Sequence, residues 1–254
     1  MHHLARTWSW SIVLFALLAS ATPADGQTEG EYLYNVTMLR AAPGHFTELI
    51  QALREAEAIH REAGDRVPFR VRHSQGDQWD FMLIRPMGSL GAYAEASRMA
   101  RREAAWNSPA GTALSERLEA FTAYEEEWFA RSVPVEELGR RFEGSGLFHI
   151  EMFAGLPGKR GELLEQRRME NRYYRHLGRQ ENVLFVREAG PNWDAMTIGF
   201  YPSLQDYAAA GVRYSEEQQN DAALAAGFDG VSDISPYLRS LLSYHHDTLA
   251  VPVN

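Results

Sequence analysis

The sequence contains an internal duplication, which limits the fold more strongly than any other feature. Compared with itself at an offset of 114 residues, the chain aligns positions 32–94 with positions 146–208 without a gap, and 18 of these 63 positions are identical. The identities include Pro43-Gly44 with Pro157-Gly158, Gly64 with Gly178, Gly76 with Gly190, Trp79-Asp80 with Trp193-Asp194, and Ser89-Leu90 with Ser203-Leu204. Solenoid units have periods of about 20–50 residues, so copies of this length indicate two small domains in tandem.

Each copy begins with alternating apolar and polar residues that predict a strand ending at a Pro-Gly turn. A long helix, two strands, a second helix after a serine cap and a last strand follow, which is the ferredoxin-like order β-α-β-β-α-β. The expected bounds after the first strand are Phe46–Glu62, Phe69–His73, Trp79–Arg85, a helix from Ser89 and Thr122–Phe129 in the first copy, and Gly161–Leu177, Val183–Arg187, Trp193–Phe200, a helix from Ser203 and Ser243–Leu249 in the second.

The expected fold is α+β, with two tandem ferredoxin-like repeats that form a dimeric α/β barrel within one chain. A single unit of this kind carries helices on one face of its sheet, and the other face must be covered. Two units in one chain can press these faces together and close a barrel. We expect residues 30–133 to form the first repeat, residues 134–145 a linker and residues 146–254 the second repeat.

Three stretches of the chain carry a resemblance to a known superfamily. They are the strand–Pro-Gly–helix segments at 34–44 and 148–158, and the strand that runs into a helix at 193–204. These stretches resemble the dimeric α/β barrels, and within them the NIPSNAP-like and antibiotic-biosynthesis-monooxygenase-like groups. The resemblance implies a lumen that binds a small, often aromatic or lipidic molecule. Its members range from cofactor-free oxygenases through haem-handling proteins to proteins with no known reaction.

The N-terminus has the composition of a secretory signal peptide. A short basic start precedes an uncharged apolar run from Trp8 to Ala19, and small residues follow. The run is shorter than the roughly 20 residues that span a bilayer. We therefore predict a signal peptide over residues 1–26, cut after Ala21, Ala24 or Gly26, and a periplasmic or secreted protein without membrane contact after cleavage. The alternative is a retained N-terminal anchor.

The composition argues against several function classes. The sequence contains no cysteine, so it has no disulfides, thiol catalysis or thiolate metal sites. Its formal net charge is −9, whereas nucleic-acid-binding proteins carry a basic surface. We therefore expect no nucleic acid as partner. The sequence also lacks a Gly-rich phosphate loop, a Gly-x-Ser-x-Gly elbow and a His-Glu-x-x-His motif.

Comparison of the copies separates the two faces of each strand. One face keeps its character, as at Tyr34 and Phe148, and is expected to pack on the helices. The other face has diverged and is predicted to line the lumen. In order along the chain, its residues Asn35, Thr37, Arg70, Arg72, Phe81 and Leu83 correspond to His149, Glu151, Leu184, Val186, Ala195 and Thr197. Because smaller residues replace Phe81 and Leu83, the pocket is expected to favour the second repeat.

His149 and Glu151 are the candidate catalytic pair, because they stand two apart on one strand and share a face. The ferredoxin-like order places Thr197 on one side of the pair and the last strand on the other. A histidine beside a carboxylate can act as a general base, with Glu151 fixing its tautomer. The candidate ligand-binding residues are Asn35, Thr37, Arg70, Arg72, Thr197, His245 and His246.

These residues predict a small organic ligand, aromatic or lipidic, and a cofactor-independent oxygenation or isomerisation as the reaction if the protein is an enzyme. Other interpretations stay open. Polar residues that line a barrel often only bond to each other and to water. Two histidines and a carboxylate can hold a divalent metal, although no metal site or cofactor is assigned. The protein can instead be a non-catalytic interaction or stress-response protein. A further alternative is haem binding through His149, His245 or His246. Assembly into a homo-oligomer is also open.

Overall fold

The computed structural model describes residues 30–190 and 192–253, so the expected signal peptide lies outside the described residues. The first repeat contains β1 (Tyr32–Ala41), α1 (Phe46–Glu62), β2 (Phe69–Gln75), β3 (Phe81–Gly88), α2 (Leu90–Tyr93), α3 (Ala96–Trp106), α4 (Pro109–Phe121) and β4 (Thr122–Ser132). The connection to the second repeat contains α5 (Val135–Phe142). The second repeat contains β5 (Leu147–Gly155), α6 (Arg160–His176), β6 (Val183–Ala189), β7 (Ala195–Tyr201), α7 (Leu204–Ala210), α8 (Glu216–Ala226), the 3₁₀ turn η1 (Val231–Asp233), α9 (Ile234–Leu241) and β8 (Leu242–Pro252).

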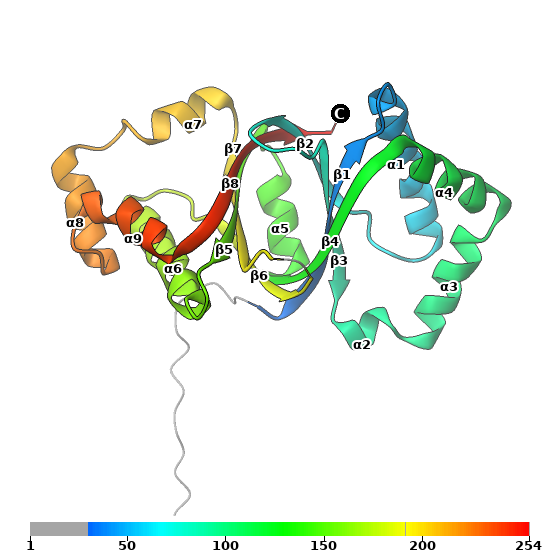
Figure 1. Ribbon diagram of the computed structural model, residues 1–254, viewed down its shortest axis with the longest axis horizontal. Helices are drawn as coiled ribbons and strands as arrows, with labels where there is room; N and C mark the ends of the chain where they lie inside the picture. Colours follow the sequence, from blue (N-terminus) through cyan, green and yellow to red (C-terminus); the bar gives the residue numbers. More distant parts are fainter. Residues whose placement is uncertain (1–29, 191, 254) are drawn as a thin grey trace, which may run out of the picture.

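The strands form one closed antiparallel barrel in the order β1-β3-β2-β8-β5-β7-β6-β4. Within each repeat the first strand lies between the third and the fourth, as the ferredoxin-like order predicts. Two seams join the repeats, because β2 pairs with β8 and β4 pairs with β6. Figure 1 shows the strands in the middle of the molecule and the helices of the two repeats on opposite outer sides. The predicted α+β fold, with two ferredoxin-like repeats closed into an intrachain barrel, is confirmed.

Apolar side chains from every strand of the barrel fill its interior. One buried cluster includes Tyr34 and Met82 of the first repeat, Phe148 and Met196 of the second, and Leu138 of the connecting helix α5. An eight-stranded barrel is just wide enough for side chains to fill it. The recurring face of each strand therefore points inward. The prediction that this face packs on the helices, and that the divergent face lines an open lumen, was wrong.

The divergent face points outward, and each repeat covers it with its own helices. Phe81 and Leu83 share a buried cluster with Leu53 of α1, and Ala195 shares one with Leu163 of α6. The inward side chains of both repeats meet in one common core and face the same packing constraints. The outward side chains meet different helices, which explains why they differ more in character between the copies.

The recurring glycines Gly76 and Gly190 lie at the two seams. Both have positive φ angles, 124° and 121°. A Cβ atom on Gly76 would lie 2.1 Å from the backbone oxygen of Asp247, and one on Gly190 would lie 2.6 Å from Cβ of Trp128. Only glycine allows the strand of the other repeat to approach so closely.

The recurring Trp-Asp pairs fix the ends of neighbouring strands. The backbone N–H of Ala41 donates to Oδ2 of Asp80 at 2.8 Å, and that of Gly155 donates to Oδ2 of Asp194 at 2.9 Å. Both tryptophans are buried in the core, as predicted. These identities between the copies thus follow from the architecture of the barrel.

The serines predicted to begin the second helix of each copy act as caps, although the helices that follow them are short. Ser89 accepts a hydrogen bond from the Ala92 backbone N–H, and Ser203 accepts one from that of Asp206. The chain then continues through further short helices, the last of which, α4 or α9, leads directly into the final strand. Across residues 30–190 and 192–253, every helix falls short of the length or the hydropathy that crossing a bilayer requires.

Candidate functional site

Two pockets occupy equivalent places between the outer face of the barrel and the helices of each repeat. The first-repeat pocket has a volume of about 450 Å³ and the second-repeat pocket one of about 530 Å³, both within the usual range for ligand sites. The strand registers show the equivalence, because Thr37 lies opposite Glu127 and Glu151 lies opposite Asp247. Five lining pairs correspond: Thr37 with Glu151, Ser115 with Ser235, Leu118 with Leu238, Glu119 with Arg239, and Glu125 with His245.

His149, Asp247 and His245 form a hydrogen-bonded row across β5 and β8 at the wall of the second-repeat pocket. Nε2 of His149 lies 3.2 Å from Oδ1 of Asp247, and Nε2 of His245 lies 3.2 Å from Oδ2. An ionised carboxylate only accepts hydrogen bonds, so each neutral imidazole carries its hydrogen on Nε2 and keeps a lone pair on Nδ1. The ring of Tyr207 on α7 lies 5.3 Å from that of His149.

Glu151 lies deeper and is held from two sides. Oγ1 of Thr197 on β7 donates to Oε2 of Glu151 at 3.2 Å, and Nη1 of Arg167 on α6 lies 3.6 Å from the same oxygen. Arg167 is only 2% exposed, forms a second ion pair with Glu170 and lies against the ring of Phe153. Since buried charges are stable only when paired, this one guanidinium holds both carboxylates in place.

The arrangement shifts three pKa values. Burial opposes protonation of His149, but the hydrogen bond to Asp247 and the nearby carboxylates outweigh it and raise the pKa of His149. The hydrogen bond from His149 lowers the pKa of Asp247 against the effect of burial. Burial raises the pKa of Glu151, whereas Arg167 opposes this shift and Glu170 adds to it. The opposite shifts of His149 and Asp247 strengthen their pairing as charged groups and make the neutral imidazole of His149 a stronger base.

A metal ion is a second chemistry that these residues could support. His149, Glu151 and Asp247 each offer one ligand atom, and these atoms lie within 4.8 Å of one another. Divalent transition metals accept such a donor set. Arg167, however, already places a cation against Glu151, and a metal ion would meet its charge. The cluster therefore fits proton transfer better than metal binding.

Two of the predicted ligand-binding residues line the pockets, and a third binds a residue that lines one of them. Thr37 lines the first-repeat pocket and His245 lines the second-repeat pocket. Thr197 lies opposite Glu151 in the register and binds it, as the strand order predicts. The histidine that the sequence placed beside Glu151 has its hydrogen bond with Asp247 instead.

The other predicted residues have structural contacts. Asn35 lies next to Thr37 on the outer face and accepts hydrogen bonds from Thr37 and Arg85. Nη1 of Arg70 donates to the Leu53 carbonyl at 2.8 Å, and its Nη2 pairs with Glu57 of α1. Arg72 lies opposite Phe81 on the same outer face. It is not among the described residues that line either pocket.

His246 is separated from the other two histidines. Its Nδ1 lies 3.0 Å from both Asp77 carboxylate oxygens at the seam, and its ring lies 4.9 Å from that of Trp193. Successive side chains of a strand point to opposite faces. A ligand between His149 and His245 therefore cannot also reach His246.

Sequence reasoning missed two residues of the site, although the sequence contained a signal for each. Asp247 stands two positions after His245, so strand alternation places it on the same face as that histidine. Arg167 corresponds in the repeat to Leu53, and a charge in place of a core leucine marks a buried ion pair.

Comparisons with known proteins place the fold. No protein-family model and no curated protein matches the sequence. Solved structures do match the fold. A candidate monooxygenase from Lactobacillus acidophilus NCFM is 8% identical with a TM-score of 0.51, and the match covers 88% of this chain and 95% of that protein. A candidate monooxygenase from Fusobacterium nucleatum is 8% identical with a TM-score of 0.52, covering 89% and 94%. An anthrone oxidase-like protein is 12% identical with a TM-score of 0.51, covering 89% and 93%.

The chain has the fold of the dimeric α/β barrels. Both repeats take part in the match, because it extends over most of each chain. Identities this low show a shared fold and leave function to the residues of the site.

Proposed function

We propose that the second-repeat pocket binds a small organic molecule and that the protein transfers a proton on it. His149 is the base, and Asp247 orients the imidazole and stabilises its charged form. The observation that carries this proposal is the 3.2 Å hydrogen bond between these two residues at the wall of a pocket of about 530 Å³. An imidazole held at Nε2 by a carboxylate can accept a proton at Nδ1. The orienting role expected for Glu151 thus passes to Asp247.

The pocket walls support a substrate with an apolar body and an acidic C–H or O–H group. Leu238 and Leu249 provide apolar surface, while the exposed Arg239 can stabilise negative charge that forms when the proton leaves. Isomerisation requires only removal and return of a proton, so these residues can carry it out alone. Cofactor-independent oxygenation is the alternative. It needs dioxygen as the oxidant, and the names of the three structural neighbours favour it.

The test is to incubate a small-molecule extract of cells with the protein and to follow its compounds by mass spectrometry. We expect one compound class to be converted by the wild type and left unchanged by His149→Gln. His176→Gln is the matched control, because His176 is exposed at the end of α6. Conversion by His149→Gln at the wild-type rate, with both variants folded, would refute the proposal. Retention of a compound without conversion would favour a non-catalytic binding protein.

We also propose that the protein is exported and that it is related to particular groups of the dimeric α/β barrels. The apolar run before residue 26 supports a signal peptide, and its removal would deliver the barrel to the periplasm or the medium. Intact-mass measurement of protein recovered from the periplasmic fraction tests this, since a full-length mass would contradict cleavage.

Kinship with the NIPSNAP-like or antibiotic-biosynthesis-monooxygenase-like groups rests on the Pro-Gly segments after β1 and β5. Assembly into a homo-oligomer stays a prediction.

A further inference from the structure

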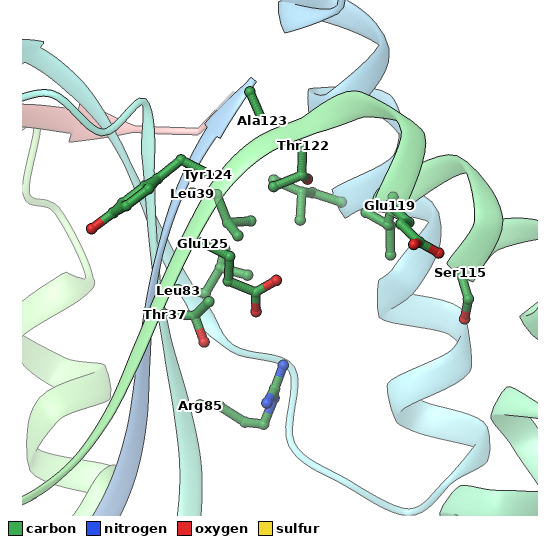
Figure 2. A pocket seen from close by; sticks show the side chains of 12 residues that line it. Thr37, Leu39, Leu83, Arg85, Ser115, Glu119, Thr122, Ala123, Tyr124 and Glu125 are labelled. Carbon is green, nitrogen blue, oxygen red and sulfur yellow. The ribbon is translucent and has the colours of Figure 1, made fainter. Parts of the chain in front are cut away.

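The first-repeat pocket is a separate cavity with a different lining. Figure 2 shows Arg85 at one end of the pocket, below Thr37 and Leu83, and Glu119 near the other end. Strands β1, β3 and β4 and helices α1 and α4 supply the walls. The apolar part of the lining consists of Leu39, Leu53, Leu83 and Leu118. A pocket of about 450 Å³ with this lining suits a small molecule with an apolar body.

Arg85 supplies the charged end of this pocket. Its Nη1 donates to Oδ1 of Asn35 at 2.9 Å, whereas its Nε is buried without a hydrogen-bond partner. Nδ2 of the same Asn35 is also buried without a partner. Among the described residues, no carboxylate lies within ion-pair distance of Arg85. A buried N–H group without an acceptor is costly, and a bound carboxylate would offer two acceptor oxygens to this pair.

Arg85 is the half-buried cation in the lining of this pocket. Arg70, on the neighbouring strand, is paired with Glu57. The side chains of Glu119 and Glu125 are exposed, so water solvates their charges. The charge of Arg85 also reaches His60 of α1, where it adds to burial in lowering the pKa of that histidine.

From these contacts we propose that the first-repeat pocket binds a small carboxylate with an apolar body, with Arg85 on the carboxylate and the four leucines around the apolar part. Arginine binds carboxylates by charge-assisted hydrogen bonds, which are among the strongest in proteins. This site lies on the other side of the barrel from His149, so it can exist whether or not the second-repeat pocket is catalytic.

The test is calorimetric titration with octanoate, octanol and octylamine, which share one apolar chain and differ in charge. We expect octanoate to bind more tightly than octanol and octylamine. Arg85→Gln should weaken octanoate binding about tenfold or more and leave octanol binding unchanged. The matched control is Arg66→Gln, which removes an exposed arginine outside the lining of the first-repeat pocket and should leave octanoate binding unchanged.

Three results would overturn the proposal: octanol or octylamine binding as tightly as octanoate, unchanged octanoate binding in Arg85→Gln, or equal losses in Arg85→Gln and Arg66→Gln. If Arg85→Gln fails to fold, Leu118→Trp serves in its place. It fills the pocket from α4 and keeps the arginine. It should weaken octanoate and octanol alike, and unchanged octanoate binding in this variant would place the ligand elsewhere.

Discussion

Leu53 of α1 and Arg167 of α6 occupy the same position in the two repeats, and so do Thr37 and Glu151 on the first strands. In the first repeat these positions form an uncharged part of the pocket wall. In the second they form a buried ion pair that extends to Glu170. The barrel is the same on both sides. The comparison shows that the outer face can exchange uncharged packing for buried charge while the shared interior keeps its apolar character.

The largest effect is expected from giving the second repeat the leucine of the first. Arg167→Leu leaves Glu151 and Glu170 buried without their cation, and an unpaired buried charge typically costs about 3–5 kcal/mol. We expect a loss of this order in the free energy of unfolding, measured by chemical denaturation at neutral pH. The exposed pair of Arg117 and Glu55 provides the control, and Arg117→Leu should cost much less.

Restoring the remaining first-repeat residues should repair this loss. The first repeat has Thr37 and Ala56 where the second has Glu151 and Glu170. Adding Glu151→Thr and Glu170→Ala to Arg167→Leu removes both unpaired carboxylates, so most of the lost stability should return. A triple variant as unstable as Arg167→Leu alone would show that the arginine acts through packing on Phe153 instead of through its charge.

The seam glycines offer a smaller test of the same comparison. Alanine at Gly76 or Gly190 would be strained by the positive φ angle, which costs about 1–3 kcal/mol, and would press on the other repeat. We expect comparable destabilisation from both variants. Only Gly76→Ala presses on Asp247 and should therefore also shift the NMR signals of the His149 ring. Equal shifts in both variants would contradict a local effect.

Much of the fold could be predicted because the duplication provides two aligned sequences for each helix and strand of the repeat. The bounds of α1 agree with the helix predicted over Phe46–Glu62. The strand order also follows from the ferredoxin-like arrangement, and it correctly placed Thr197 beside Glu151. A period of two separates the faces of a strand without showing which face points inward. Similarity between the copies suggests a face that packs on helices, whereas in this barrel it reflects the common core.

The site was less predictable because its contacts join distant elements. Asp247 reaches His149 from the last strand, nearly a hundred residues along the chain. Arg167 reaches Glu151 from a helix whose buried face was unknown. Six more residues lie between Glu151 and Asp247 than between Thr37 and Glu127, so the repeat alignment breaks before the last strand. The equivalence of the two pockets therefore appears only once the strand registers are known.

The smallest expected effect concerns one histidine in each repeat, the buried His60 and the half-buried His149, whose pKa values shift in opposite directions. Burial, aided by Arg85, lowers the pKa of His60 to about 4. The unfolded chain takes up this proton near its ordinary value of about 6.5, so His60 reduces the free energy of unfolding as the pH falls from there toward 4. The pKa of His149 is raised, so this residue contributes stability below about 6.5 and loses the contribution as the pH rises through its folded pKa.

Denaturation curves measured across this pH range should separate the two histidines. The stability advantage of the wild type over His149→Gln should be largest at acidic pH and shrink as the pH rises. Relative to His60→Gln, the wild type should instead lose stability as the pH falls below about 6.5. Asp247→Asn removes the carboxylate that holds His149, so it should lower the pKa of that ring in an NMR titration and leave His60 unchanged. If the pKa values of both histidines were shifted in the same direction, the two repeats would provide similar electrostatic environments. The contrast between their pockets would then be limited to shape.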